Sequence, residues 1–345
     1  MVNLIEVSPQ DIVASRFAIS PLIVTKHALW LLSGKKEAGV WRAWVDRVRE
    51  PYENLLAGRP GLGAMVTLFR ERRYNADFPA PPPAGVNTPF EVELATVRAT
   101  PVAQAHHEIA RNLDGMARLP DAVMDVLLSP EVVDLFADAL QGVWEEIVAP
   151  AWPRFHVILE RDVIQRAGRL ATYGWAAALA DLSPRVRWRP DGVIEVRAES
   201  PDETYRLDGR GLLFVPSPFE AGVGSYLEHA WPYAISYPAR GAGIAQEAPD
   251  GLAGLIGRTR TRVLLELAGP ATTTQLVTLL GLSLGTVGGH LAALRRAGLV
   301  TGSRTGRGVL YHRTALGDSL VSPPAPLPWD GARVSPSALR PSARA

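Results

Sequence analysis

The sequence predicts an α+β fold in which a mostly helical N-terminal domain with a small antiparallel sheet precedes a compact C-terminal module of three helices and a β-hairpin. Three observations predict it. Apolar residues recur at helical spacing as far as residue 182, short β-branched and aromatic runs follow residue 184, and an arginine-rich segment begins near residue 252. The chain has 345 residues, which is long enough for two domains. We place the boundaries at 1–245, 246–321 and 322–345.

Proline and capping residues delimit the helices expected in the N-terminal domain. PLIVTKHALWLL (21–32) begins with proline and carries an apolar stripe. PAPPPAGVNTP (79–89) is too rich in proline for a helix interior, whereas PFEVELATVRAT (89–100) predicts a short amphipathic helix. Ser129-Pro130-Glu131 caps another helix. A longer helix over 153–182 is expected to bury Phe155, Leu159, Val163, Leu170 and Trp175.

After Pro184 the pattern changes to short runs with turn residues between them. VRWRPDG, VIEVRAE, GLLFVPS and YAISYPA are typical of strands, and Asp191-Gly192 indicates a hairpin turn. We therefore expect an antiparallel meander here, followed by a linker at 239–251. The tail 322–345 is rich in proline, serine and alanine, a composition typical of disorder.

Composition excludes several classes of protein. The chain contains no cysteine, so it forms no disulfide, thiolate metal site or cysteine nucleophile. Its first residues, MVNLIEVSPQDIVASRF, lack the apolar run of a secretion signal. No window reaches the roughly 18 uncharged apolar residues of a membrane span. We therefore expect a cytoplasmic protein with no membrane partner.

The module that begins near residue 252 carries the signals of two helices joined by a tight turn. A first helix, Leu252–Ala268, ends at Gly269-Pro270. Thr272 or Thr273 caps a second helix, Gln275–Leu280, and in Gly281-Leu282-Ser283 glycine ends this helix while serine caps the next. The third helix runs to Ala297, with Gly298 after it, and is expected to bury Val287, Leu291 and Leu294.

Two short strands and a basic tip follow the third helix. LVTGSR and VLYHR flank Thr305-Gly306-Arg307-Gly308, so the segment predicts a hairpin. Helices at a tight turn followed by a basic hairpin make a winged helix-turn-helix, in which the hairpin is the wing. Between Leu252 and Arg313 eight arginines stand against one glutamate, a net charge of +7, so the rest of the chain carries −6 of the total of +1. A basic module on an acidic body indicates a polyanionic partner for the module.

The order of these residues resembles a known family. T-x-x-Q-L-x-x-x-L-G-L-S-x-x-T-V-x-x-H-L-x-x-L-x-x-A-G-L-V, followed by a wing ending in Y-x-R, is similar to the arsenic-repressor (ArsR) family of bacterial transcription regulators. The N-terminal half resembles a large domain of unknown function that precedes ArsR-type modules in actinobacterial regulators. The segments that carry this second resemblance are RFAISPL (16–22), PFEVELATVRATP (89–101), GLLFVPSPF (211–219) and YPARG (237–241). The resemblance implies a DNA-binding transcription regulator, expected to act as a repressor.

The resemblance also implies that the third helix enters the major groove of double-stranded DNA. Ser283 and Thr286 would approach phosphates, and the wing arginines would hold the DNA backbone. His290 lies either at the groove edge or packed within the module, and Arg295 and Arg296 lie either against phosphates or in solvent at a helix C-terminus. The expected DNA-binding residues are Ser283, Leu284, Gly285, Thr286, Gly288, Gly289, His290, Ala292, Arg296, Arg304 and Arg307.

Glycines at 285, 288 and 289 leave the outward face of the third helix nearly bare. The resembled family usually places polar side chains at positions 288 and 289, where base edges are read. Each glycine costs a helix about 1 kcal/mol relative to alanine. Either the bare surface lets the helix approach the groove closely, the reading we prefer, or the residues have drifted in a weakly specific module. Both readings predict few hydrogen bonds to base edges and a larger part for DNA shape.

The metal sites of the resembled family are missing. Its members bind metal through a cysteine pair on the helix before the turn, or through His and Asp on a C-terminal helix used for dimerisation. Here the first position reads TTQLVTLLGLS, and only TALGDSL follows the wing before the prolines. We therefore expect no metal, no cofactor and no dimerisation through a C-terminal helix. The N-terminal domain is expected to supply homodimer contacts, a pocket for an organic effector if release from DNA is regulated, or both.

Two alternatives to a DNA-binding regulator are weighed. One is an enzyme in the N-terminal domain, but no G-x-S-x-G, P-loop or H-E-x-x-H motif is present. His106 and His107 point about 100° apart on a helix, and His156 with Glu160 makes a surface pair, so we expect no catalytic or metal site. The other is a winged-helix module that binds protein and has little sequence-specific DNA binding. The tryptophans are interpreted as core rather than as a pocket: Trp30, Trp41, Trp44, Trp152, Trp175 and Trp231.

Overall fold

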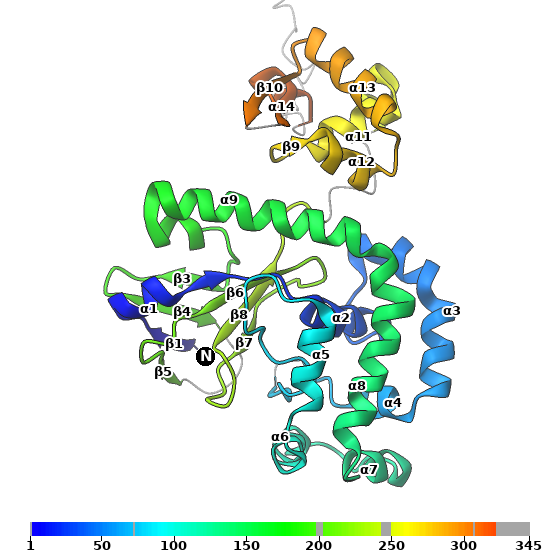
Figure 1. Ribbon diagram of the computed structural model, residues 1–345, viewed down its shortest axis with the longest axis vertical. Helices are drawn as coiled ribbons and strands as arrows, with labels where there is room; N and C mark the ends of the chain where they lie inside the picture. Colours follow the sequence, from blue (N-terminus) through cyan, green and yellow to red (C-terminus); the bar gives the residue numbers. More distant parts are fainter. Residues whose placement is uncertain (1, 72, 198–202, 243–249, 306–307, 322–345) are drawn as a thin grey trace, which may run out of the picture.

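The protein is described by a computed structural model that covers residues 2–71, 73–197, 203–242, 250–305 and 308–321. It contains both helices and strands, with a helix-turn-helix near the C-terminus (Figure 1). The predicted tail 322–345 lies outside the described residues. Among the described residues no single helix is long and apolar enough to cross a membrane. Two short helices of the helix-turn-helix reach the required composition only as a pair, and they are bent by 113°.

Helices of the N-terminal part pack around one large apolar core. The predicted helix over residues 21–32 is confirmed as α2, and every side chain from Pro21 to Leu31 is buried. The predicted helix after Pro89 is confirmed as α5. The elements of this part are α2 (Pro21–Leu32), η1 (Gly39–Trp41), α3 (Arg42–Gly58), α4 (Pro60–Thr67), α5 (Phe90–Arg98), α6 (Val102–Leu113), α7 (Asp121–Leu127), α8 (Val132–Val143), the π-helical turn η2 (Trp144–Val148), the 3-10 turn η3 (Ala149–Ala151) and α9 (Trp152–Leu179).

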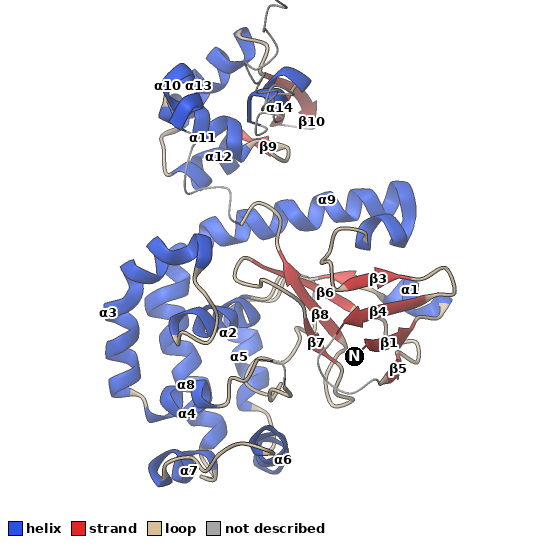
Figure 2. Cartoon of the chain, turned by 180° about the vertical axis from the view of Figure 1, so that it is seen from behind, coloured by secondary structure: helices blue, strands red, loops and turns tan. Residues whose placement is uncertain are grey.

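Two four-stranded sheets lie beside the helices (Figure 2). Along the chain, a short helix, α1 (Pro9–Ala14), connects β1 of one sheet to β2 of the other. One sheet has the order β3-β4-β1-β5, with β3 (Val186–Trp188), β4 (Val193–Arg197), β1 (Val2–Glu6) and β5 (Thr204–Arg206). The other has the order β2-β6-β8-β7, with β2 (Arg16–Phe17), β6 (Leu213–Ser217), β8 (Ala234–Pro238) and β7 (Gly224–Tyr226).

The prediction of a simple antiparallel meander is wrong, because both sheets are mixed. β1 pairs with β5 in parallel, β2 pairs with β6 in parallel, and β6 pairs with β8 in parallel. The first two pairs arise because the N-terminal residues join strands some 200 positions later in the chain. The parallel pair of β6 and β8 arises because the strand between them in the chain, β7, does not lie between them in the sheet. It pairs with the other edge of β8. The predicted turn at Asp191-Gly192 is confirmed: it joins β3 to β4, and Gly192 has φ +82°.

Helix α9 joins the helical core to the sheets. Phe155 and Leu159 are buried in the helical core, as predicted, whereas Val163, Leu170 and Trp175 are half-buried. The helix is broken at Gly174, where φ is +77°, and ends at Leu179 rather than at residue 182. Of the six tryptophans interpreted as core, those at 30, 41, 44 and 231 are buried, whereas Trp152 and Trp175 are half-buried.

The C-terminal part has its own apolar core. The predicted first helix is wrong in one respect: Gly257 adopts φ +86° and divides it into two. A short helix, α14, follows the hairpin, where we expected none; Gly317 of this helix packs against the backbone of Leu299. The elements are α10 (Asp250–Ile256), α11 (Arg258–Glu266), β9 (Ala271–Thr272), α12 (Thr273–Leu280), α13 (Leu284–Arg296), β10 (Val300–Thr305), β11 (Gly308–Arg313) and α14 (Ala315–Val321).

Candidate nucleic-acid interface

Local signals at three residues build the turn between α12 and α13. Thr272 caps α12 in a reciprocal capping box with Gln275. Gly281 ends α12 with φ +66°, a left-handed conformation that favours glycine. Ser283 caps α13: its hydroxyl accepts a hydrogen bond from the Thr286 amide at 3.2 Å. The chain therefore turns sharply between the helices, and β10 pairs with β11 and β11 with β9 behind them in an antiparallel sheet.

Helix α13 has one buried face and one bare face. Val287, Leu291 and Leu294 are buried in the C-terminal core, as predicted. Leu284 begins the helix with 63 % of its surface exposed, which is unusual for a leucine and leaves an apolar contact surface free. The other outward residues named from the sequence are exposed (Ser283, Gly285, Thr286, Gly289, Ala292 and Arg296) or half-buried (Gly288 and His290).

Packing within the protein does not require the glycines on this face. A Cβ atom built at Gly285, Gly288 or Gly289 meets no atom within 4 Å outside the helix backbone and neighbouring residues. None of the three has the positive φ that would demand glycine. Alanine therefore fits at each position, and the helix would be more stable with it. Glycine at these positions is therefore explained either by a molecule that contacts the helix from outside, or by no structural requirement at all.

A hollow of about 410 Å³ lies beside the bare face. It is bounded by Gly288, Leu291, Ala292, Arg295, Arg296 and Tyr311. Tyr311 comes from β11, so the hollow spans the helix and the hairpin. The sequence reasoning used Tyr311 only as part of the wing motif and did not place it at this surface. The signal available was an aromatic residue in the second strand of the predicted hairpin, which follows a helix with glycines on its outward face.

The remaining basic residues divide between surface and interior. Arg304 is exposed near the end of β10, and Arg307 lies outside the described residues. Arg313 is turned inward: its guanidinium pairs with Asp318 at 2.8 Å and donates to the Leu264 carbonyl at 3.4 Å. The His290 imidazole makes no hydrogen bond or ion pair with another described side chain, which leaves it available at the edge of the α13 surface.

Helix α9 holds the helix-turn-helix through Arg161. Its guanidinium donates hydrogen bonds to the carbonyl oxygens of Glu266 (2.7 Å), Gly269 (2.6 Å) and Pro270 (3.2 Å), where α11 ends. The Glu266 carbonyl belongs to the last turn of α11, where the negative end of the helix dipole favours a cation, and the other two carbonyls follow in the next loop. Burial raises the pKa of the Glu266 carboxyl, and the nearby charges of Arg161 and Arg154 oppose that rise. One arginine thus satisfies three carbonyl groups of the helix-turn-helix.

Helix α12 makes the second contact with α9. Gln275 lies 3.5 Å from the Glu160 carboxylate, and Leu279 is buried with the apolar core of the N-terminal part. In Figures 1 and 2, α12 faces α9 whereas α13 lies on the opposite side of the C-terminal part. The α13 face is therefore unobstructed by the rest of the described chain.

Other candidate clusters from the sequence have structural partners. His106 lies 3.0 Å from the Ser129 carbonyl oxygen, and Glu108 accepts the Asp77 and Phe78 amides at 2.8 Å each. Glu160 contacts α12, as described above, and His156 lies against the Trp152 ring. Among the described residues no group of three or more His, Asp and Glu side chains is arranged to hold a metal ion.

Comparison with known proteins identifies one segment. Residues 258–301 match the family model described as bacterial regulatory protein, arsR family. The match runs from the start of α11 through α12 and α13 to the second residue of β10. No curated protein and no solved structure matches the chain. The segment is therefore an ArsR-type helix-turn-helix, and the large N-terminal part lies outside the match.

Substituting Arg161→Ala is expected to loosen the helix-turn-helix from α9. The change leaves three carbonyl groups without their donor; the partly buried carbonyls of Glu266 and Gly269 lose hydrogen bonds to a charged group, each of which contributes about 1.5–3 kcal/mol. Amide hydrogen exchange in 258–280 should become about tenfold faster in the full-length protein. The control is Arg169→Ala, which removes an arginine of the same helix that pairs with Asp181 instead. Equal exchange in the wild type and Arg161→Ala would show that Arg161 does not hold the two parts together.

Proposed function

We propose that this protein is a DNA-binding transcriptional regulator, a repressor, that places α13 in the major groove of double-stranded DNA and the β10–β11 hairpin, as its wing, along the backbone. The observation that carries the proposal is the outward face of α13, which is largely exposed and carries glycines between Leu284 and Arg296, on a helix that lies on the side away from α9. A helix in this position of a helix-turn-helix reads DNA in the motifs of this class.

Phosphate contacts are available at both ends of this face. The Ser283 and Thr286 hydroxyls lie 2.8 Å apart and exposed at the N-terminus of α13, where free backbone amides and the helix dipole favour phosphate. Arg295 and Arg296 are exposed in the last turn, and Arg304 is exposed on the hairpin. Leu284 and Ala292 lie between them as apolar contacts for thymine methyl groups. This distribution supports backbone contacts at the ends and a close, mostly apolar approach in the middle.

The charge of the module favours DNA over a protein partner. A bare helix face also suits a protein-binding winged helix, which is the second candidate function. Between Leu252 and Arg313, however, eight arginines stand against one glutamate, and that glutamate is buried beside Arg161. An excess of exposed positive charge near an accessible helix is the electrostatic pattern of a nucleic-acid-binding surface.

The N-terminal part is proposed to form a homodimer and to hold an organic effector. One helix-turn-helix covers a single half-site, and regulators commonly double it through two-fold symmetry. Helix α14 packs on its own module through Gly317 and Asp318, so it is not the proposed dimer contact. The contacts between α9, α11 and α12 give the N-terminal part a direct physical connection to the DNA-binding part.

Reversing the wing charges is expected to weaken binding to every duplex. Arg304→Glu with Arg307→Glu should lower affinity about tenfold or more and reduce the slope of log K against log salt by about two, because phosphate contacts carry no sequence information. Fluorescence anisotropy with two unrelated duplexes measures both quantities. The control, Arg42→Glu with Arg118→Glu, makes the same charge change on exposed residues of the N-terminal part. Unchanged affinity in the wing variant would contradict the assignment of the hairpin.

The substitution Gly289→Ala distinguishes the two explanations of the α13 glycines, which are close approach of the helix to the DNA groove and drift of the residues in a weakly specific module. The added methyl group meets no other part of the protein, so the helix should gain about 1 kcal/mol in stability. Under close approach, DNA affinity falls about tenfold, or about 1.4 kcal/mol, although the protein melts at a higher temperature. The matched control is Gly168→Ala, an exposed position in α9 where the Cβ also meets nothing within 4 Å. It should raise stability without changing affinity. Affinity that holds or rises in Gly289→Ala would reject close approach.

The mass of the full-length protein in solution tests the proposed homodimer. Light scattering after size exclusion at micromolar concentration should give twice the chain mass of 37.2 kDa. The fragment 250–321 should be monomeric under the same conditions, because the dimer contacts are assigned to the N-terminal part. A full-length protein with the mass of one chain would contradict the proposed dimer.

A further inference from the structure

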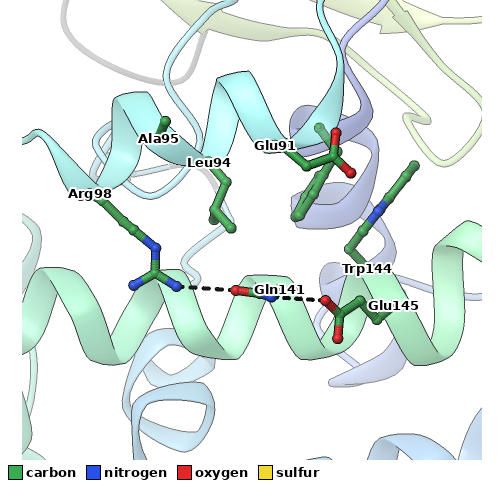
Figure 3. A pocket seen from close by; sticks show the side chains of 8 residues that line it. Glu91, Leu94, Ala95, Arg98, Gln141, Trp144 and Glu145 are labelled. Atoms are coloured by element: carbon green, nitrogen blue, oxygen red, sulfur yellow. Dashed lines mark hydrogen bonds between the residues drawn. The ribbon is translucent and has the colours of Figure 1, made fainter.

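A groove of about 280 Å³ opens between α5 and the end of α8 with η2 (Figure 3), and none of the residues that line it belongs to the helix-turn-helix. Helix α5 forms one wall, and α8 with its π-helical extension forms the other. The residues that line it are Phe90, Glu91, Leu94, Ala95, Arg98, Gln141, Trp144 and Glu145. Its volume suits a small molecule rather than a protein segment.

Flat apolar groups line the groove. The Trp144 ring stacks on the Phe90 ring with centroids 4.6 Å apart and planes 9° from parallel. The Trp152 and Trp144 rings meet in a T-shaped arrangement with centroids 5.2 Å apart, and Leu94 is buried. These contacts fix the orientation of Trp144, which stays half-buried. The groove therefore presents a rigid aromatic surface on which a planar ring can lie.

The uncompensated charge in the groove is negative. The Arg98 guanidinium is occupied by Asp138 at 2.6 Å, Gln141 at 3.1 Å and Asp134 at 3.4 Å. Glu145 receives only the Gln141 amide at 2.8 Å, and Glu91 has no hydrogen bond or ion pair with another described side chain. Figure 3 places Arg98 toward one end of the groove and Glu91 with Glu145 toward the other, where Trp144 lies. A ligand at that end would meet two carboxylates, neither of which is paired with a cation of the described residues.

The backbone at this wall has an unusual conformation. Residues Trp144–Val148 form a π-helical turn in which the Ala149 amide bonds to the Trp144 carbonyl. Such turns are rare and occur frequently at functional sites. Here the turn begins at the two residues, Trp144 and Glu145, that supply the aromatic surface and one of the carboxylates.

We propose that this groove binds a planar organic cation. Its ring would lie against the part of Trp144 that Phe90 and Trp152 leave uncovered, and its positive centre would face Glu91 and Glu145. Attraction between a cation and an aromatic face adds to the attraction of the carboxylates, and both act most strongly in a partly desolvated groove. An anion of the same shape meets repulsion from the same carboxylates. The inference goes beyond DNA binding and does not depend on it, because the groove contains no residue of the helix-turn-helix.

Calorimetry with three flat bicyclic aromatic probes of different charge tests the proposal. The probes are the cation N-methylquinolinium, neutral quinoline and the anion 1-naphthoate, each titrated at pH 8 into the full-length protein without DNA. N-methylquinolinium should bind about tenfold more tightly than quinoline, and naphthoate should bind weakest. Equal affinity for cation and neutral ring, or no binding of the cation at millimolar concentration, would overturn the proposal.

Carboxylate variants localise the site. Glu91→Gln with Glu145→Gln should lower affinity for N-methylquinolinium about fivefold, toward that of quinoline, because only its attraction to the aromatic surface remains, while quinoline affinity stays the same. Both side chains are exposed, so the variant keeps its fold, which its melting temperature verifies. The matched control is Glu146→Gln, which removes the neighbouring exposed carboxylate that does not line the groove, and it should leave cation affinity within about twofold. Equal losses in both variants, or none in the double variant, would show that the groove is not the site.

Discussion

A buried ion pair in helix α9 fixes the framework on which the rest of the structure depends. Asp162 and Arg166 are both fully buried, with 3.1 Å between the Arg166 Nε and the Asp162 carboxylate. Burying two charges is costly unless every lone pair and proton finds a partner. Here the Tyr237 hydroxyl donates to Asp162 at 2.7 Å, and Arg166 donates to the Ala178 carbonyl at 3.0 Å. The pair therefore attaches α9 to β8 and to its own C-terminal turn, and it sets the rotation of the helix about its axis.

The rotation of α9 about its axis also determines the direction in which Arg161, the residue before Asp162, points. Neighbouring residues on a helix point about 100° apart, so with Asp162 directed to the sheet, Arg161 is directed to the end of α11. Docking α11 and α12 on α9 uses one side of the helix-turn-helix and leaves α13 free on the other. The consequence of this docking that matters for function is that the glycine-bearing face of α13 stays exposed. Its glycines are not required by packing, so their reason is sought in what approaches the helix from outside.

Local signals in the sequence predicted the helix-turn-helix well. Caps at Thr272 and Ser283, a left-handed Gly281 and the apolar spacing of Val287 act within a few residues, so the structure agrees with the pattern. Features set by distant residues were missed. The parallel pairing of β1 with β5 joins segments about 200 positions apart, and the Arg161 contact joins segments more than 100 positions apart. Neither pairing produces a periodic pattern in the sequence. The break at Gly257 was missed because one glycine is compatible with a continuous helix as well as with a bend.

The salt dependence of binding tests the central claim, that the face of α13 and the hairpin bind duplex DNA. Each phosphate contact adds about −0.9 to the slope of log K against log salt. Phosphate contacts by Arg296, Arg304 and Arg307 together should give the full-length protein a slope of about −3 or steeper on an unrelated duplex, from about 50 to 200 mM salt. A slope near zero, or no binding at about 50 mM salt, would contradict the account and favour the protein-binding alternative.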